Sequence, residues 1–479
     1  MADDLQGKKT ESPQAGEPTP ATNLLKLKEM KGLVAFGLSQ GEGEPELTPT
    51  EAGSGFELKG YKASELRRNI EPWLTSLFQS EHLSLLVGTG LSYAVHMKAT
   101  GSLPKGFENR QYAVFNDQIQ TEAKRTAEAS ERGAPNPEDQ LRTALKLREG
   151  IHVLLAAHPN TYEGLKDDYD KLIKEIDTAL EELANGMLAA ERGMSGKNAA
   201  TDNGKAEDAL RLLVSFIMSF ASRTGTRDRL HIFTTNYDRL IEFGAELAGL
   251  RLLDRFIGSL APVFRSSRLD VDYHYNPPGI RGEPRYLEGV ARLTKLHGSL
   301  DWVDEGHEVR RAALPFGADD FKPYVKDAGR LLIYPNEAKD RETAEYPYVE
   351  LFRDLASAAC RPNSTLVTYG YGYGDDHINR IILDMLTIPS THLVMISRDN
   401  TGDRLTNFIT RSKRSSQITV LIGDHFGDLE ALVDHYLPKP AIDRASIRMA
   451  ELLKSRGFEG KPAPEQAADT DLGVKPEPA

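Results

Sequence analysis

The sequence predicts an α/β protein built on a doubly wound, mainly parallel sheet with a large helical insertion. From residue 230 onward, short apolar runs alternate with longer runs of helical spacing, which is the pattern of strands joined by crossover helices. Four apolar runs along the chain end in small or polar turns that precede a helix-like run. Between about residues 106 and 225, apolar residues recur at helical spacing. Together these patterns indicate a Rossmann-like sheet that helices interrupt.

The expected elements follow the chain in order. Residues 1–60 are rich in Pro, Gly, Glu, Ser and Thr, so we expect a mostly disordered arm with a short amphipathic segment at residues 24–38. The main domain is expected over residues 61–440, with the helical insertion at about 106–225. Residues 441–479 are expected to form a C-terminal helix and tail. Strands of the sheet are expected at residues 83–87, 230–234, 291–296, 331–334, 365–370, 392–396 and 417–422.

Composition and charge limit the class of protein. The 479 residues are 39% hydrophobic and 27% charged, which is typical of a soluble globular chain. The net charge of −12 argues against a protein that binds nucleic acid through an overall basic field, so no direct nucleic-acid binding is expected. The single cysteine, Cys360, excludes an intramolecular disulfide and a cysteine-based zinc site. Since no apolar run approaches the roughly 20 residues of a membrane span, we expect a cytoplasmic protein without membrane contact.

The first of the four turns is rich in glycine. Gly88, Thr89, Gly90 and Ser92 follow an expected strand and open a helix. Glycines at these positions would let backbone N–H groups approach a pyrophosphate at the positive end of the helix dipole. The motif departs from the dinucleotide-binding fingerprint, because Tyr93 stands where the third glycine would fall. A plain tight turn explains the same residues, so the motif alone leaves both interpretations open.

The second turn carries Asn236 and Asp238 directly after the strand expected at residues 230–234. Side chains at the carboxyl end of a parallel strand can point into the crevice where doubly wound proteins bind their ligands. Asparagine and aspartate are also favoured as the N-terminal cap, the residue directly before a helix. A cap on the helix that follows is therefore the structural alternative for either residue.

The third turn carries His297, which precedes Gly298 at the end of another expected strand. Most of the 12 histidines should be ordinary surface or core residues. Because an imidazole titrates near neutral pH, a histidine at a strand end beside a small residue is well placed for acid–base chemistry.

The fourth turn runs from Gly370 to His377 and alternates glycine with tyrosine at its start. Its glycines would admit the ribose of a ligand, and its tyrosines, Tyr371 and Tyr373, would cover a ring. Asp375 or Asp376 would cap the next helix whether or not the turn binds a ligand. We expect the four turns to form one rim around one pocket.

Taken together and in this order, the motifs GTGLS, TTNYD, KLHGS and GYGYGDDHIN resemble the sirtuin, or silent-information-regulator, superfamily of NAD-consuming proteins. The resemblance covers roughly residues 66–436 and implies NAD as the substrate. It makes Asn236 the group that orients the ribose and the attacking water, His297 the base, and Asp238 the residue that fixes the loop or a ribose hydroxyl. The residues that it places against NAD are Gly88, Thr89, Gly90, Ser92, Thr235, Gly370, Tyr371, Ser397 and Arg398.

Two departures from the deacylating sirtuins narrow the resemblance. Thr235 stands where those enzymes carry glutamine, and one cysteine cannot build their four-cysteine zinc module, so no zinc is expected. The pattern looks more like the bacterial sirtuin-like branch that hydrolyses NAD in antiviral defence, often beside a HerA-type ATPase or another phage sensor. That likeness implies an NAD+ glycohydrolase that releases nicotinamide and ADP-ribose, halts growth by abortive infection, and acts as an oligomer or with such a partner. The alternatives are an NAD-dependent protein deacylase or ADP-ribosyltransferase, and a non-catalytic regulatory subunit that binds NAD or ADP-ribose.

Overall fold

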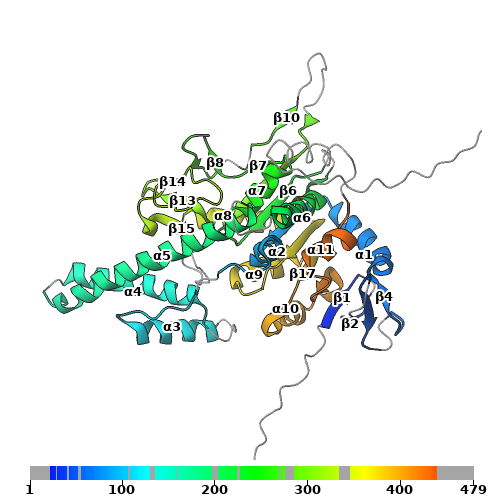
Figure 1. Cartoon of the computed structure of the whole chain (residues 1–479), viewed down its shortest axis with the longest axis horizontal. Helices are drawn as coiled ribbons and strands as arrows, with labels where there is room; N and C mark the ends of the chain where they lie inside the picture. The colour runs from blue at the N-terminus through cyan, green and yellow to red at the C-terminus, as the bar shows by residue number, and fades with distance from the viewer. Residues whose placement is uncertain are drawn as a thin grey trace, which may run out of the picture.

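The structure is a computed structural model with an eleven-stranded sheet at its centre and helices on both faces (Figure 1). It describes residues 22–28, 30–39, 43–51, 55–105, 108–129, 135–158, 160–196, 203–223, 227–267, 269, 271–275, 285–333 and 346–439. The expected C-terminal helix and tail over residues 441–479 lie outside the described residues.

Seven neighbouring strands of the sheet run parallel. They are β7 (Arg251–Leu253), β12 (Val290–Lys295), β6 (Leu230–Thr234), β5 (His82–Val87), β16 (Ser364–Tyr369), β17 (His392–Ser397) and β18 (Ile418–Ile422), in this spatial order. Starting from β5, the chain first adds β6 and β12 on one side and later β16, β17 and β18 on the other. This reversal between β5 and β16 makes the sheet doubly wound and Rossmann-like, so the predicted fold class is confirmed.

Four antiparallel strands extend the sheet beyond β18. They are β1 (Thr22–Lys26), β2 (Val34–Ser39), β3 (Glu46–Pro49) and β4 (Tyr61–Lys62). This differs from the mostly disordered arm expected over residues 1–60, of which 1–21 lie outside the described residues. The physical reason is burial, since Leu25, Phe36 and Leu47 are fully buried once β1 pairs with β18. Such apolar area offsets the entropy of ordering a polar segment.

Helices cover the two faces of the parallel sheet in two groups. One face packs against α1 (Ala63–Phe78), α2 (Thr89–Thr100), α6 (Asn203–Ala221) and α7 (Leu240–Leu247). The other packs against α8 (Tyr348–Ala359), α9 (Asp376–Met385) and α10 (Arg404–Ser412), while the short α11 (Leu429–Ala431) follows β18. Successive strand residues alternate between the two cores, as Leu366 and Val367 do. Among the described helices, none is both long and apolar enough to cross a membrane.

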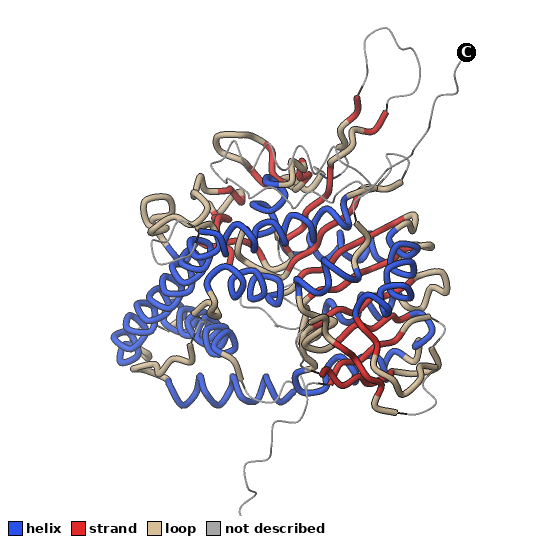
Figure 2. The backbone as a smooth tube through the Cα atoms, turned by 45° about the vertical axis from the view of Figure 1, so that its right-hand side comes forward, coloured by secondary structure: helices blue, strands red, loops and turns tan. Residues whose placement is uncertain are grey.

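The helices of the expected insertion extend from one side of the sheet (Figures 1 and 2). They are α3 (Asn116–Ala129), α4 (Pro137–Ala157) and α5 (Lys166–Met194), which share a core of their own with part of a second sheet. The last helix of the range, α6, belongs instead to the main core, because Leu213 and Ile217 pack there.

The second sheet is antiparallel and has five strands, in the order β15-β13-β14-β9-β8. Their bounds are β15 (Leu331–Ile333), β13 (Gly298–Asp304), β14 (Val309–Arg311), β9 (Val263–Phe264) and β8 (Phe256–Ile257); a separate hairpin joins β10 (His274–Tyr275) to β11 (Arg285–Tyr286). The strand predicted at residues 331–334 therefore exists at 331–333 but was wrongly placed in the parallel sheet. A three-residue apolar run carries too little pattern to distinguish the two kinds of strand.

Candidate functional site

The carboxyl ends of β16, β5, β6 and β12 lie side by side at one edge of the parallel sheet. Tyr369, Val87, Thr234 and Lys295, near or at the ends of these strands, are in register with one another. The four turns singled out in the sequence follow these residues directly, so the structure brings them together. This edge, next to the reversal of strand order, is where doubly wound proteins bind ligands.

The glycines of the first and fourth turns allow two loops to approach closely. A Cβ atom on Gly88 would lie 2.4 Å from the carbonyl oxygen of Gly370, and one on Gly90 would lie 2.5 Å from the Cα atom of Gly370. The Gly88 N–H donates to the Tyr369 carbonyl at 3.0 Å and the Gly90 N–H to the Gly370 carbonyl at 3.1 Å. Gly370 itself has a φ of +60°, which favours glycine. Both N–H groups expected to face a pyrophosphate are therefore engaged by the neighbouring loop.

Asn236 is buried at 4% exposure between the turns of β5 and β6. Its Nδ2 donates to the Gly88 carbonyl at 3.1 Å and to the Ser92 hydroxyl at 3.0 Å. The amide is thus directed at the β5 turn and does not cap α7. Its Oδ1 is buried and has no hydrogen-bond partner among the residues that the structure describes. Because a buried acceptor without a partner is costly, this oxygen marks a position where a ligand hydroxyl or a water would be stabilised.

Asp238 joins the same cluster and fixes its geometry. Its Oδ2 accepts from the Ser92 hydroxyl at 2.6 Å, and its Oδ1 accepts from the Leu240 N–H at the start of α7 at 3.0 Å. Both carboxylate oxygens are therefore in use within the protein. Of the two roles expected for Asp238, fixing the loop is the one that these contacts serve.

His297 is bonded to a carboxylate from the fourth turn. Its Nε2 lies 2.9 Å from Oδ2 of Asp375, whose Oδ1 caps α9 by accepting from the N–H groups of His377 and Ile378 at 2.9 and 3.1 Å. Burial raises the pKa of the Asp375 carboxyl, but the hydrogen bond and charge of His297 and the Ile378 N–H outweigh burial and hold that pKa below its usual value. An ionised Asp375 accepts but cannot donate, so Nε2 of His297 carries the proton.

Tyr237, which follows Asn236 in the chain, connects the Asn236 turn with the His297 turn. The Tyr237 and His297 rings lie 6.4 Å apart between centroids. The Tyr237 carbonyl accepts from the N–H of Leu300 at 3.0 Å on β13, just beyond the His297 turn. The two predicted residues therefore belong to adjacent turns.

Lys295 holds the Asn236 turn through hydrogen bonds to its backbone, although it was not singled out as a site residue from the sequence. It is 1% exposed, and its Nζ donates to the carbonyls of Asp238 and of Tyr237 (3.4 Å), and to Glu242 Oε1 at 3.1 Å. The signal that could have found it is its place two residues before His297 on a buried strand, where a charge must have partners.

Arg239 clamps the same turn to the helical insertion. Glu191, a fully buried residue of α5, accepts from the Arg239 backbone N–H at 3.0 Å, from Nε at 3.1 Å and from Nη2 at 2.5 Å. Its Oε2 also accepts from the Gly317 N–H at 2.9 Å. The position of the Asn236 turn therefore depends on α5, and no local sequence signal marked Glu191.

A cavity of about 710 Å³ opens on the β16 and β17 side of the cluster. Gly90, Gly370 and Arg398, all predicted as ligand-binding, line it together with residues of α2. Arg398 is an exposed side chain whose Nε lies 3.3 Å from Asp424 Oδ1. Ser397 instead turns back on its own loop, where its hydroxyl donates to the Asp399 carbonyl at 2.9 Å.

The remaining predicted residues are placed differently. Thr89 is exposed at the first position of α2, and the Thr235 N–H continues the sheet by donating to the Val87 carbonyl at 3.2 Å. Tyr371 is 5% exposed and lies in the core, where its hydroxyl donates to the Asp375 carbonyl at 3.2 Å or to Asn379 Oδ1 at 3.1 Å. We expected Tyr371 to cover a ring of the ligand, but in the structure its side chain is packed inside the protein core.

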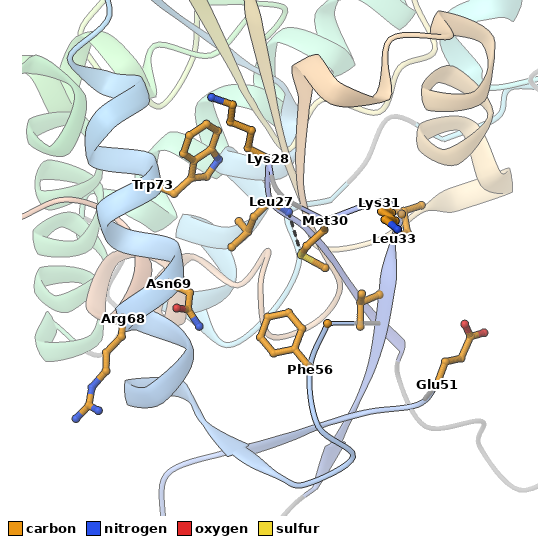
Figure 3. Close-up of a pocket in the computed structure, with 13 residues that line it drawn as sticks. Leu27, Lys28, Met30, Lys31, Leu33, Glu51, Phe56, Arg68, Asn69 and Trp73 are labelled. Atoms are coloured by element: carbon orange, nitrogen blue, oxygen red, sulfur yellow. Dashed lines mark hydrogen bonds between the residues drawn. The ribbon is translucent and has the colours of Figure 1, made fainter. Parts of the chain in front are cut away.

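Another cavity, of about 820 Å³, lies between the turn after β1 and helix α1, far along the sheet from the clustered turns (Figure 3). Phe56 and Trp73 line it, and Lys28 Nζ lies 5.6 Å from the Trp73 ring centroid. None of the predicted site residues is among its lining, so size alone does not identify the candidate site.

Among the described residues, no group of three or more His, Cys, Asp or Glu side chains is arranged to hold a metal ion.

The fold and the clustered turns define a doubly wound α/β protein with a candidate ligand site at the strand reversal. Residues 230–418 match a family described as the SIR2-like domain. The matched segment contains the turns of Asn236, His297 and Gly370, while the glycine turn after β5 precedes it. A comparison with curated proteins found no match to the chain. SIR2-like domains use NAD and are typically enzymes, so the match supports the sirtuin-like superfamily and an NAD-related activity.

Proposed function

We propose that the protein is an NAD+ glycohydrolase that cleaves NAD to nicotinamide and ADP-ribose. The observation that supports this most is the buried Oδ1 of Asn236, which has no partner among the described residues and lies one strand from the His297–Asp375 pair. Hydrolysis at a sugar carbon requires a hydrogen-bond acceptor and a base close together, and Asn236 and His297 both lie at the carboxyl edge of the sheet.

The chemistry sets the demands on the site. Breaking the bond between nicotinamide and ribose develops an oxocarbenium-like cation at the anomeric carbon, as in glycoside hydrolysis. Nicotinamide starts as a cationic pyridinium and leaves neutral, so no general acid is needed. The site must hold the ribose, position a water and accept a proton.

Each demand has a candidate group. Asn236 Oδ1 accepts a hydrogen bond from a ribose hydroxyl or from the attacking water. His297 accepts the proton at Nδ1, because Nε2–H is bonded to the Asp375 carboxylate, which also stabilises the imidazolium that forms. Ser92 and Asp238 keep the Asn236 amide in place through their hydrogen bonds.

The rest of the nucleotide fits the β16 and β17 side. The adenosine half would occupy the cavity of about 710 Å³ that Gly90, Gly370 and Arg398 line. Because the Gly88 and Gly90 N–H groups are engaged, the diphosphate would rely on the positive end of the α2 dipole.

The test is to incubate the purified chain with NAD and identify the products by chromatography. We expect nicotinamide and ADP-ribose, or its cyclic form, in amounts equal to the NAD consumed. His297→Ala and Asn236→Ala should each abolish turnover, and the matched controls His307→Ala and Asn69→Ala, which change exposed residues, should not. Unchanged turnover in both site variants would refute the assignment. Turnover that requires an acylated peptide or labels a protein would favour the deacylase or transferase, and tight NAD binding without any product would favour the regulatory subunit.

We further propose that this activity serves bacterial antiphage defence by NAD depletion, with the chain acting as an oligomer or with a HerA-type ATPase. The resemblance of the four motifs to the defence branch supports this role, and an NAD hydrolase that no assembly restrained would harm its own cell. Light scattering of the purified chain should give a mass above that of one copy. Infected cells that express the chain should lose NAD, and cells that express His297→Ala should keep it; NAD loss that is equal in both would refute the role.

A further inference from the structure

A cavity of about 340 Å³ lies at the amino ends of the parallel strands, the edge of the sheet opposite the clustered turns. Its floor is formed by Ser84 on β5, His231 on β6 and Arg292 on β12, which are in register across three neighbouring strands. Residues of α8 form one wall. The cavity is therefore separate from the proposed nucleotide site.

Arginine dominates the lining of this cavity. The lining contains Arg229, Arg255, Arg292, Arg353 and Arg361, against the carboxylates of Asp228 and Asp354. Two more carboxylates, Asp272 and Glu350, pair with lining arginines from just outside. Five guanidinium groups thus face four carboxylates, in a chain whose net charge is −12.

Four of the five arginines have a close carboxylate partner. The pairs are Arg255 with Asp354 at 2.5 Å, Arg361 with Asp228 at 3.2 Å, Arg229 with Asp272 at 3.1 Å, and Arg353 with Glu350. Arg292 differs, because its Nη2 lies 4.0 Å from Oδ2 of Asp272, and that carboxylate already accepts hydrogen bonds from Arg229. The Arg292 Nε is buried and has no hydrogen-bond partner within the described part of the chain.

The charges of these arginines also affect His231, which lies beside Arg292 on the neighbouring strand. Burial, followed by the charges of Arg292, Arg255 and Arg361, lowers the pKa of His231 well below its usual value. Its ring stacks on Phe233 at 4.0 Å, and its Nε2 lies 2.9 Å from the Thr294 hydroxyl. The cavity floor is therefore a neutral imidazole beside a guanidinium with an unused donor.

We propose that this cavity binds a small phosphate-bearing anion that accepts from Arg292. A guanidinium presents its N–H groups in a planar fork that matches phosphate oxygens, and a charge-assisted bond would satisfy the buried Nε. Arg353 and Arg361 are placed to complete the contact from the α8 side. The ligand class is inorganic phosphate, pyrophosphate or the phosphate end of a small metabolite.

The test is calorimetric titration of the full chain with inorganic phosphate and with pyrophosphate, at an ionic strength held constant with chloride. The unmodified chain should bind, and Arg292→Gln should lower the affinity at least tenfold. Arg353→Gln, which changes a side chain that is 62% exposed and so leaves the fold intact, should weaken binding severalfold. The matched control Arg411→Gln changes an exposed arginine on α10 and should bind like the unmodified chain. Circular dichroism confirms that each variant is folded.

Three results would overturn the proposal. One is an absence of binding of both anions to the unmodified chain at millimolar concentration. Another is an affinity of Arg292→Gln equal to that of Arg411→Gln. The third is loss of binding in Asn236→Ala, which would place the anion at the clustered turns instead; the proposal expects that variant to bind phosphate unchanged.

Discussion

Replacing Glu191 by glutamine tests how the helical insertion holds the Asn236 turn. The Glu191 carboxylate accepts four hydrogen bonds, three from Arg239 and one from the Gly317 N–H, and each of its oxygens accepts two. Glutamine turns one oxygen into an NH2 donor, so two of the four bonds lose their acceptor whichever way the amide faces. The buried Arg239 then loses the carboxylate that is bonded to its guanidinium, and only the charges of Asp301 and Glu242 act on it.

The magnitude follows from the bonds that are lost. Two hydrogen bonds to charged groups, at about 1.5–3 kcal/mol each, sum to about 3–6 kcal/mol. This range overlaps the roughly 3–5 kcal/mol typical of breaking a buried ion pair. We therefore expect Glu191→Gln to lower the free energy of unfolding by about 4 kcal/mol. NAD turnover should fall as well, because Arg239 directly follows Asp238 in the turn.

The assay is urea unfolding followed by circular dichroism, with Glu182→Gln as the matched control. Glu182 lies on the same helix, α5, and pairs with Arg110 at 2.7 Å, but its side chain is 59% exposed. An exposed pair contributes little, so the control should change the free energy of unfolding by less than about 1 kcal/mol. A Glu191→Gln variant as stable as the Glu182→Gln control would refute the reasoning.

Three further predictions concern single residues. Gly90→Ala places a methyl group 2.5 Å from the Gly370 Cα atom, so we expect a loss of about 1–3 kcal/mol from overpacking in urea unfolding, together with lower NAD turnover; full stability would contradict the loop contact. Asp375→Asn can donate to His297 and so stabilise the wrong tautomer, and kcat should fall roughly 10²-fold with a shifted pH profile and little change in KM; an unchanged profile would remove Asp375 as a positioning residue. Burial, aided by nearby lysine charges, lowers the pKa of His392 to about 4, so the neutral form is favoured in the folded protein. The free energy of unfolding should therefore fall by at most about 3 kcal/mol as the pH falls from 6.5 toward 4, because protonation of His392 favours the unfolded chain. His392→Gln should make the free energy of unfolding less dependent on pH in this range. An equally steep pH dependence in the variant would contradict the prediction.

Six of the seven parallel strands were predictable because each is marked twice, by a strand-forming run and by the small or polar turn after it, whereas the three-residue β7 was not among the predicted strands. β16 is buried along its whole length, its sequence STLVTY is rich in the β-branched and aromatic residues that favour strands, and the turn that follows it supplies the glycines and the capping Asp375. Where the strand-forming run or the turn after it is weak, the strand was not predicted. β1 to β3 are short and lie among Pro, Gly and Glu, and Leu25 becomes a core residue only through its pairing with distant β18.

The candidate site was predictable as a set of turns, but the contacts within it were not. The sequence indicated that Gly88 and Gly90 needed to be glycine, yet the reason is the approach of Gly370, which is far along the chain. Glu191 looked like any charged helix residue, since its burial depends on Arg239. Long-range partners of this kind leave no periodic or local trace in a sequence.

The most direct test of the proposed site is a crystal structure of the protein with ADP-ribose. The ribose that carried nicotinamide should lie within hydrogen-bond distance of Asn236 Oδ1 and of His297 Nδ1, with the adenosine in the cavity that Gly90 and Arg398 line. ADP-ribose bound elsewhere, or Asn236 Oδ1 bonded within the protein while the ribose lies apart, would contradict the claim that these turns form one site.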